Sequence, residues 1–527
     1  MLKALTAARG MVTAPHHLAA QAGLGVLRDG GNAVEAMIAA ASTIAVVYPH
    51  MNGIGGDGFW LISRPGKPAV GIDASGRAAA LATPDWYRGK GCAAIPSRGP
   101  LAANTVAGAM SGWIAALETA GGRLPLARLL QDAIWYAREG TPVTQSQVNY
   151  TTRFQGELAP QPGFAGTFLR DGSAPQARSL QRFPALAQTF ERLAQRGLDD
   201  FYRGDVAQAM AAELSRVGSP LRVDDLAQHR AALVDPLSVD LSAGTVYNLP
   251  PPTQGIASLM ILAIFDRIRE GVAPDTFGHV HGIVEATKQA FLVRNRHVCD
   301  PDVMQVNARE FLRDATLAAC ARAIDARRAR AWPEPAAKGD TVWMGAVDGD
   351  GMLVSYIQSV YWEFGSGVVL RDTGVTWQNR GASFSLDDES HVKLEPGRKP
   401  FHTLNPALAH LPDGREMVYG NMGGDGQPQS QATVWSRYAM FGQDLQQAIS
   451  APRWLLGRTW GDMSVSLKLE NRFEPSLIAE LQDAGHEIDV VEAYSDLVGH
   501  AGALVRHPNG VISGATDPRS DGAVAGF

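Results

Sequence analysis

Apolar residues recur at three- and four-residue spacing over residues 16–47, a stretch rich in alanine. This spacing predicts amphipathic helix, and the adjacent Gly30 and Gly31 divide the helix in two. Asn32 is a suitable N-cap for the second helix, and Glu35 three residues later completes a capping box. The chain is therefore expected to begin with two consecutive helices.

The pattern changes after Pro49. A glycine-rich loop at 52–58 precedes two runs, 59–63 and 69–73, whose aromatic and β-branched residues predict strands. Both runs are short and bounded by glycine, proline or charged residues, as strands usually are.

Residues 100–330 have mostly helical patterns, with Arg- and Ala-rich amphipathic segments at 186–197 and 318–332. Three prolines within 246–255 interrupt this region and force an extended connection, because proline cannot continue a helix. From 341 onward the chain is richer in strand patterns and glycine, so the best boundary lies at about 340.

The switch at this boundary is abrupt. A Pro- and Ala-rich linker, 332–340, is followed by strand-like residues 341–347, an Asp-Gly-Asp-Gly turn and a second strand-like run, 352–359. This arrangement predicts a β-hairpin that begins at Thr341. A self-cleaving precursor would expose a new N-terminus at such a point, and Thr341 would then carry both a hydroxyl nucleophile and an α-amine base. The hairpin alone also fits a threonine that merely begins a strand.

Composition limits the classes of protein that remain. The 527 residues suggest roughly three or four domains by length alone, and 45% hydrophobic with 19% charged residues is typical of a globular protein. A net charge of -6 without a long Lys/Arg run argues against nucleic-acid binding. The three cysteines, Cys92, Cys299 and Cys320, are too far apart for a disulfide framework or a metal-binding CxxC pair. No signal-peptide core or membrane-length apolar run is present, so a cytoplasmic enzyme without membrane contact is the default expectation.

Two glycine loops are candidates for ligand chemistry. Gly53, Gly55 and Gly58 match the dinucleotide-binding spacing, with Asp73 at a suitable distance for a ribose. That fingerprint needs a strand before it and a helix after it, and here the order is the reverse, so we expect no nicotinamide cofactor. The second loop, 421–427, has consecutive glycines that suit an oxyanion hole, and it suits a tight turn equally well.

Several distinctive motifs follow one another along the chain. They are, in order, GMVTAPHHLAAQAGLGVLRDGGNAVEAMIAA, PHMNGIGGDGFWL, LPPPTQG, DTVWMGAVDGDG, FGSG, GNMGGDGQPQ and DPRSDGAVAGF. Together these motifs resemble the γ-glutamyltransferase family of N-terminal-nucleophile hydrolases. The resemblance spans nearly the whole chain. It implies an α/β fold, a four-layer αββα sandwich formed jointly by two chains from one precursor. The chains would be a large subunit, 1–340, and a small subunit, 341–527, that make one structural domain, which overrides the estimate from length.

The resemblance also implies the catalytic residues. The precursor would cut itself between Asp340 and Thr341 by an N-to-O acyl shift, and Thr341 would become the nucleophile. Ser359 stands eighteen residues later, where the family has a threonine that hydrogen-bonds the nucleophile. Gly423 and Gly424 match the oxyanion glycines. No metal and no cofactor are implied.

The substrate pocket departs from that of γ-glutamyl enzymes, which clamp an α-amino and an α-carboxylate group. At the matching positions Ser75 replaces an arginine, with Arg77 two residues on, Tyr361 replaces an asparagine, Ser383 replaces an acid, and His402 with Thr403 replaces a Ser-Ser pair. Without the acid, nothing obvious pairs with a substrate ammonium, and an unpaired buried charge is costly.

Bulky residues reinforce this interpretation. Tyr361 and its neighbour Trp362, with Trp377, add volume near the nucleophile strand, and Arg77, His402 and Thr403 offer hydrogen-bond donors. We therefore expect a small anionic, carboxylated amide as substrate. The alternatives are that Arg77 holds the 50s loop, that the aromatic residues belong to the core, and that the histidine is structural.

Two other functions stay open. One is an acylase or a γ-glutamyl hydrolase or transferase of the same family, and the other is an unprocessed binding or structural relative. The sequence does not determine the oligomeric state, and a dimer of processed heterodimers is compatible with it.

Overall fold

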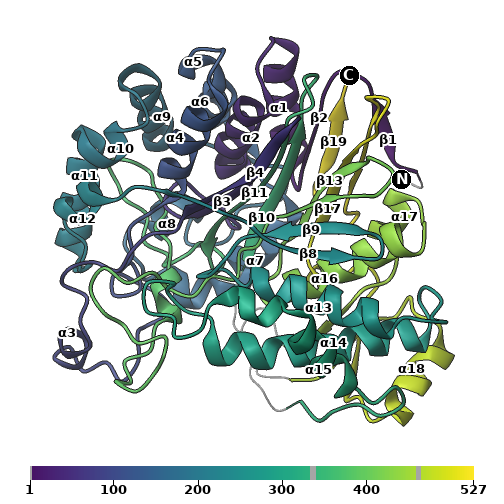
Figure 1. The fold of residues 1–527 in the computed structure, drawn as a ribbon. Coiled ribbons are helices and arrows are strands. Elements are labelled where there is room, and N and C mark those ends of the chain that lie inside the picture. Colours follow the sequence, from purple (N-terminus) through teal and green to yellow (C-terminus); the bar gives the residue numbers. More distant parts are fainter. Residues whose placement is uncertain (1–2, 333–339, 458–464) are drawn as a thin grey trace.

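The computed structural model describes residues 3–332, 340–457 and 465–527 (Figure 1). Two seven-stranded sheets form its centre. The strand order of sheet A is β1 (Leu5–Ala7), β18 (Ile512–Thr516), β17 (Ala501–Arg506), β13 (Glu416–Asn421), β12 (Ala407–His410), β9 (Gly244–Asn248) and β8 (Leu237–Leu241). That of sheet B is β19 (Ala523–Gly526), β2 (Met11–Ala14), β10 (Asp340–Val347), β11 (Leu353–Tyr361), β3 (Asp57–Arg64), β4 (Lys67–Ala74) and β7 (Ala232–Val234).

Apolar side chains fill the space between the two sheets. This inner cluster includes Phe59 and Leu61 of β3, Trp343 of β10 and Val418 of β13. Side chains alternate between the two faces of a strand, so Val342 and Met344 point the other way, into the helical layer beyond sheet B. The central strands are buried on both faces, which explains why their sequences show continuous apolar runs.

Helices cover the outer face of each sheet. On sheet B lie α1 (His17–Arg28), α2 (Ala33–Val47) and α4 (Ala109–Ala120). On sheet A lie α13 (Gly255–Ile268), α16 (Gly426–Trp435) and α17 (Leu445–Ser450), and α14 (Phe277–His297) packs against α13 and α16. The layers are thus helix, sheet, sheet, helix, and the predicted four-layer αββα fold is confirmed.

Shorter elements surround these layers. They are α3 (Pro84–Arg88), α5 (Leu126–Leu129), α6 (Gln131–Glu139), α7 (Gln145–Leu158), α8 (Phe164–Phe168), α9 (Pro184–Arg196), α10 (Asp200–Arg203), α11 (Asp205–Val217), α12 (Val223–Gln228), α15 (Asp314–Arg322) and α18 (Pro475–Asp483). The remaining strands are β5 (Thr141–Pro142) with β6 (Leu180–Gln181), and β14 (Trp454–Leu456) with β15 (Leu467–Glu470) and β16 (Ile488–Val491). One-turn helices are η1 (Ala308–Leu312), η2 (Arg380–Ser383), η3 (Ser436–Met440) and η4 (Asp496–Val498). In the described part of the chain, no helix is both long enough and apolar enough to cross a membrane.

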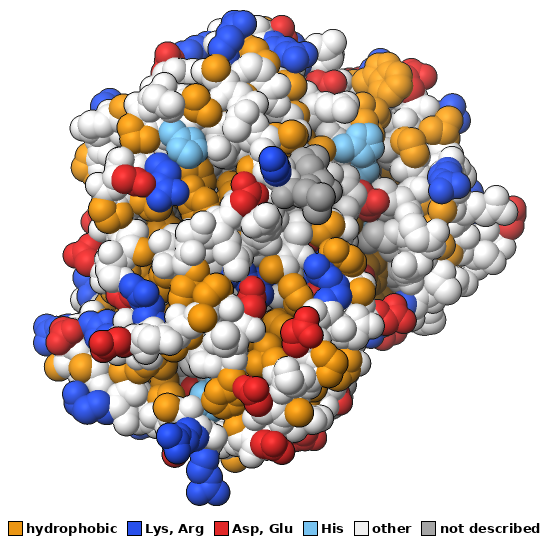
Figure 2. Space-filling model, turned by 90° about the vertical axis from the view of Figure 1, so that its right-hand side faces the viewer, with side chains coloured by type: hydrophobic (Ala, Val, Ile, Leu, Met, Phe, Trp, Pro, Cys, Tyr) orange, Lys and Arg blue, Asp and Glu red, His pale blue; other side chains and the backbone are white. Residues whose placement is uncertain are grey.

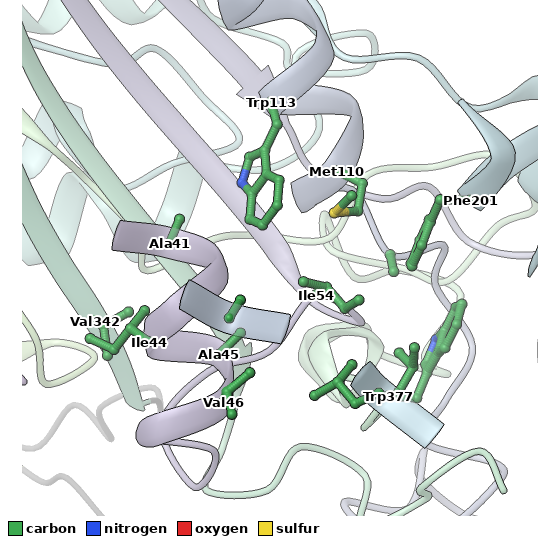
Figure 3. Close-up of a cluster of buried hydrophobic side chains, with 14 of the residues drawn as sticks. Ala41, Ile44, Ala45, Val46, Ile54, Met110, Trp113, Phe201, Val342 and Trp377 are labelled. Atoms are coloured by element: carbon green, nitrogen blue, oxygen red, sulfur yellow. The ribbon is translucent and has the colours of Figure 1, made fainter. Parts of the chain in front are cut away.

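Helix α2 shows why the first prediction succeeds. The Asn32 side chain accepts hydrogen bonds from the backbone N–H groups of Val34 and Glu35, and Glu35 accepts one from Asn32 N at 2.8 Å, so the capping box is present. All of its residues are buried, and small side chains let the helix pack closely on sheet B. Figure 3 shows Ile44 of α2 beside Val342 of β10, the neighbour of Thr341.

Both sheets contain strands from either side of residue 341. In sheet B, β10 lies between β2 and β11, and β11 pairs with β3. In sheet A, β12 lies between β13 and β9. A cut before Thr341 would leave these pairings in place, so the two products would still share both sheets.

One helix prediction was too long. The segment 318–332 continues the helical pattern, but α15 ends at Arg322. Beyond it, the chain is held to α14 by side chains: His281 Nε2 lies 2.8 Å from Asp325 O, and Lys288 Nζ donates to Arg330 O at 2.5 Å. Tertiary hydrogen bonds override the helix propensity of Arg and Ala here.

Side chains of both charges are interspersed on the face shown in Figure 2. Lys and Arg side chains alternate there with Asp, Glu and apolar groups, and the described residues of this face form no single basic patch. This distribution agrees with the net charge of -6.

Candidate active site

Thr341 lies at an irregularity between β10 and β11. Asp340 pairs with Tyr361, whereas Val342 pairs with Gln358, so one extra residue of β11 faces Thr341. Such a bulge re-aims side chains and is common beside active sites. Thr341 is 1% exposed, and the register places it next to Ser359 on the neighbouring strand.

Ser359 is fixed by the turn that follows it. The backbone N–H of Tyr361 donates to Ser359 Oγ at 2.8 Å. Tyr361 itself has a φ of 85°, in the left-handed region that is unusual for a bulky residue. Backbone strain of this kind persists only where the surroundings hold it, and it concentrates at functional sites.

The first glycine loop lies against these residues. A Cβ on Gly56 would lie 2.0 Å from Ser359 O, and one on Gly55 would lie 2.2 Å from Thr376 O. Glycine is therefore required for the backbones to approach each other. Strand β3 begins directly afterwards at Asp57, so the loop has the wrong context for dinucleotide binding, as expected.

The second glycine loop reaches the same edge of the molecule. Trp343 covers Gly420 of β13, where an added Cβ would lie 2.1 Å from its ring. The turn after β10 contacts Arg506, because a Cβ on Gly351 would lie 2.9 Å from that guanidinium, and Arg506 pairs with Glu416 at the start of β13. The start of β10 and the end of β13 therefore lie together, which places Thr341 beside the loop that follows β13.

The conformation of this loop suits an oxyanion hole. Gly423 and Gly424 have φ angles of 117° and 53°, which favour glycine. The neighbouring N–H groups of Met422 and Gly426 donate to backbone oxygens, whereas among the described residues those of Gly423 and Gly424 donate to none. Two adjacent N–H groups of this kind form an anion-binding nest.

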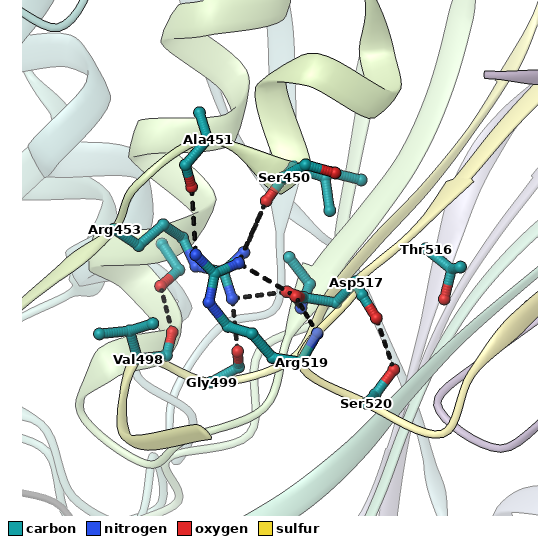
Figure 4. A network of polar contacts seen from close by, with 12 residues as sticks. Ser450, Ala451, Arg453, Val498, Gly499, Thr516, Asp517, Arg519 and Ser520 are labelled. Carbon is teal, nitrogen blue, oxygen red and sulfur yellow. Dashed lines mark hydrogen bonds and ion pairs between the residues drawn. The ribbon is translucent and has the colours of Figure 1, made fainter. Parts of the chain in front are cut away.

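A buried charge network supports this loop from behind (Figure 4). A Cβ on Gly499 would lie 2.1 Å from Met422 O, so the two segments are in contact. Arg453 donates to Gly499 O and forms an ion pair with Asp517, which also accepts from Ala501 N at 2.6 Å. Burial alone would raise the pKa of Asp517, but the Arg453 and Arg519 guanidinium groups outweigh it and lower the pKa to about 2.

Two of the predicted pocket residues, Tyr361 and Thr403, meet at a residue that the sequence analysis missed. The Arg380 guanidinium carbon lies 3.5 Å from the Tyr361 ring centroid, and its Nη1 lies 3.3 Å from Thr403 Oγ1. Gln254 Nε2 donates both to Thr403 O at 2.7 Å and to Gly424 O at 2.8 Å. This amide links Thr403 to the glycine loop.

A sequence signal for Arg380 did exist. It is the only charged residue between Asp372 and Asp387, in a stretch that contains Trp377 and Ser383. A lone cation in an aromatic and polar segment is a candidate for burial with a ligand.

His402 lies near Arg380, and its imidazole is bonded to a carboxylate. Its Nε2 lies 2.8 Å from Asp57 Oδ2. Burial first, and the Arg380 charge second, lower the pKa of His402 in spite of this bond. The other Asp57 oxygen accepts from Gly76 N, Gly108 N and Gln378 Nε2 at 2.9 to 3.0 Å. His402 thus helps to orient a carboxylate that holds three segments together.

The structure does not bring Arg77 into this group. Its side chain is 44% exposed and donates to Gly397 O and to Asp302 at 2.8 and 3.1 Å. Asp73, considered above as a ribose ligand, instead pairs with Lys399 at 2.6 Å. Ser383 donates to the Arg380 carbonyl oxygen at 3.0 Å.

One group with metal-ligand geometry occurs among the described residues, away from this pocket. Potential ligand atoms of His281, Glu285 and His486 lie within 4.8 Å of one another. Lys288 Nζ lies 2.6 Å from Glu285 Oε1, and this ammonium already neutralises the carboxylate. The chemistry of the group does not favour a cation.

A threonine that begins a central strand of facing sheets, with a glycine nest beside it, has the organisation of an N-terminal-nucleophile hydrolase. The comparison of sequences narrows this class. The profile of the family described as Gamma-glutamyltranspeptidase matches residues 19–527, and the chain belongs to that family. It is an amidohydrolase-type enzyme made as a self-processing precursor.

Characterised relatives differ in the reaction that their names describe. The chain is 55% identical to an oxamate amidohydrolase proenzyme of Klebsiella pneumoniae over 98% of both chains. It is 40% identical to a glutathione hydrolase-like proenzyme of Bacillus subtilis over the full length of both. The crystal structure of a cephalosporin acylase from Bacillus halodurans matches with a TM-score of 0.91 and 35% identity, covering 100% of this chain and 97% of the other.

Proposed function

We propose that the precursor cuts itself between Asp340 and Thr341 and that the processed enzyme hydrolyses oxamate to oxalate and ammonia, as a step of purine (allantoin) breakdown. The observation that carries this proposal is the 55% identity, over 98% of both chains, to an oxamate amidohydrolase proenzyme. Two residues near the proposed site support it. Arg380 is a buried cation that could pair with a substrate carboxylate, and position 383 carries a serine in place of an acid.

Processing would use the same hydroxyl as catalysis. Thr341 Oγ attacks the carbonyl carbon of Asp340, and the acyl group moves from nitrogen to oxygen. Water then hydrolyses the resulting ester. The products are a carboxylate at Asp340 and a free α-amine at Thr341, which is the base that the next reaction needs.

Hydrolysis of the substrate would follow in two steps. Thr341 Oγ attacks the amide carbon while the α-amine accepts its proton, and this amine has a pKa of about 7.7 to 8.0 in model compounds, close to working pH. The N–H groups of Gly423 and Gly424 stabilise the tetrahedral oxyanion, a contribution of typically about 100- to 1000-fold per donor. The C–N bond breaks, the amine returns the proton to the departing ammonia, and water hydrolyses the oxalyl ester.

A second candidate is an acylase for a dicarboxylate side chain such as glutaryl. The TM-score of 0.91 to a cephalosporin acylase favours it. A γ-glutamyl hydrolase or transferase is less favoured, because Ser383 stands where an acid would pair with the substrate ammonium. An unprocessed relative would lack the free α-amine altogether.

A denaturing gel and two assays test the proposal. The wild-type protein should give two bands and release ammonia from oxamate, and Thr341→Ala should give one band and no ammonia. Cleavage of a γ-glutamyl anilide without ammonia release from oxamate would overturn the oxamate assignment. A single wild-type band would overturn the processing step as well.

A further inference from the structure

Arg380 is a fully buried cation that lacks an anionic partner. Its residue is 1% exposed, and its Nε and Nη2 atoms have no hydrogen-bond partner among the described residues. No carboxylate of the described chain forms an ion pair with it; the nearby acids Asp57 and Asp425 are engaged by His402 and Arg294.

Burial of the Arg380 charge costs free energy of folding unless an anion pairs with it. An arginine stays protonated even when buried, and burial of an unpaired charge is strongly unfavourable. The Tyr361 ring at 3.5 Å offsets part of the cost through a cation–π contact. It cannot satisfy the two remaining nitrogens, which lie in the plane of the guanidinium and need acceptors.

The neighbours of Arg380 connect its two unpartnered nitrogens to the proposed reaction site. Its stacking partner, Tyr361, pairs with Asp340, the residue before Thr341. Its hydrogen-bond partner, Thr403, is joined through Gln254 to Gly424 of the glycine loop. An anion on Arg380 would therefore lie between the nucleophile strand and the oxyanion loop.

We infer that Arg380 binds the carboxylate of the substrate, that Thr403 adds a hydroxyl hydrogen bond, and that Tyr361 holds the guanidinium plane. The inference deepens the proposed function and rests on it. It specifies the substrate class as short amides with a carboxylate next to the reacting carbonyl. A planar guanidinium matches a carboxylate through two parallel hydrogen bonds, which a neutral amide cannot form.

The same residue explains the exclusion of γ-glutamyl substrates. Their amino-acid head carries an ammonium beside its carboxylate, so a head bound to Arg380 would place this ammonium near the guanidinium without an acidic partner. Ser383 offers only a hydroxyl, which is already bonded to backbone oxygens at 3.0 and 3.3 Å. Arg380 is thus a specificity-determining residue for an anion that carries no adjacent ammonium.

Calorimetric binding of oxalate to the processed enzyme tests the inference separately from turnover. Oxalate is the proposed product and is not hydrolysed. We expect Arg380→Gln to weaken oxalate binding about 100-fold. Arg380→Lys should weaken it about 10-fold, because lysine keeps the charge but cannot make two parallel hydrogen bonds to one carboxylate. Thr403→Val, which leaves Arg380 in place, should lose about 5-fold, as expected for one hydrogen bond.

Arg415→Gln is the matched control. Arg415 also stacks on a tyrosine, Tyr438 at 5.1 Å, but lies at the opposite end of β13 from the glycine loop. It should bind oxalate like the wild type. Each variant is checked for two bands on a denaturing gel.

The outcomes are distinct. Two results would overturn the proposed role of Arg380. One is an oxalate affinity that is unchanged in Arg380→Gln, and the other is wild-type enzyme that binds neutral oxamide as tightly as oxalate. The oxamide comparison needs no variant, so a folding defect in Arg380→Gln would not prevent the test. If Arg380 proves necessary for oxalate binding but no ammonia is released from oxamate, the proposed reaction fails while the carboxylate site stands.

Discussion

Thr341 and Ser359 acquire their relation from a local irregularity of two strands. The extra residue in β11 lets Ser359 lie beside Thr341 while its hydroxyl accepts the N–H of Tyr361 at 2.8 Å. In a regular antiparallel ladder the residues of β10 and β11 would pair one to one, and the Ser359 hydroxyl would lack the bulge that directs it. We propose that Ser359 orients the Thr341 hydroxyl, with the strained Tyr361 backbone as part of its support.

Removal of this hydroxyl should slow catalysis more than it destabilises the protein. We expect Ser359→Ala to lower kcat by about 10- to 100-fold, the range for loss of one hydrogen bond to a reacting group. Ser359→Thr keeps the hydroxyl and should stay within a few-fold of the wild type. Ammonia release and the fraction processed are measured for both variants. Equal activity of Ser359→Ala and wild type would contradict the assigned role.

At the scale of elements, the glycine loop after β13 depends on the segment behind it. That segment, which contains Gly499, is held by a buried network of Arg453, Asp517 and Arg519 (Figure 4). Arg519 also pairs with Glu470. The loop itself has two residues with positive φ, so it relies on these neighbours to keep one conformation. The network supports the glycine loop through backbone contacts, from Arg453 to Gly499 O and from Gly499 to Met422 O.

Loss of the Asp517 charge should destabilise the protein in a pH-dependent way. Because the folded pKa is lowered to about 2 from 3.8, the carboxylate stabilises the fold above about pH 4, and this is lost as pH falls through about 2. The shift corresponds to about 2 kcal/mol, and removal of one member of a buried pair costs about 3–5 kcal/mol. Asp517→Asn should therefore lower Tm markedly at pH 7 and by less at pH 3.

Asp413→Asn serves as the control for this experiment. Asp413 pairs with Arg415 at 2.7 Å, but its side chain is 55% exposed. Exposed pairs contribute only about 0–1 kcal/mol, so its Tm should change little at either pH. A Tm difference for Asp517→Asn that is the same at pH 7 and pH 3 would contradict the linkage.

At the scale of the whole molecule, both sheets combine strands from the two sides of the proposed cleavage point. The central pairings across that point, β2 with β10 and β11 with β3, are backbone ladders whose paired residues are all buried. Separation of the two products would expose the apolar layers and unpair these strands, whereas the cut itself removes none of these interactions.

The processed chains should consequently remain one particle. Two bands on a denaturing gel should correspond to a single peak in size-exclusion chromatography, at the elution volume of the uncleaved Thr341→Ala precursor. Denaturant should separate the chains. Two native peaks after processing would contradict the shared-sheet arrangement.

Much of this organisation follows from local patterns. The helix pair with its Asn32 cap, the two strands after the first glycine loop and the hairpin at Thr341 are all found as predicted, because each depends on neighbours in sequence. The helix expected over 318–332 was too long, because hydrogen bonds from α14 compete for its backbone.

Residues distant in sequence account for what local patterns could not predict. The sequence by itself determined the hairpin, the glycine loops and the candidate nucleophile Thr341, since backbone preferences and short-range spacing specify them. Only the tertiary structure decided that Arg77 points to Asp302, that His402 bonds to Asp57, and that Arg380 is the buried cation beside Tyr361. The charge state and the partners of a polar side chain depend on burial, and burial is decided when distant elements pack together.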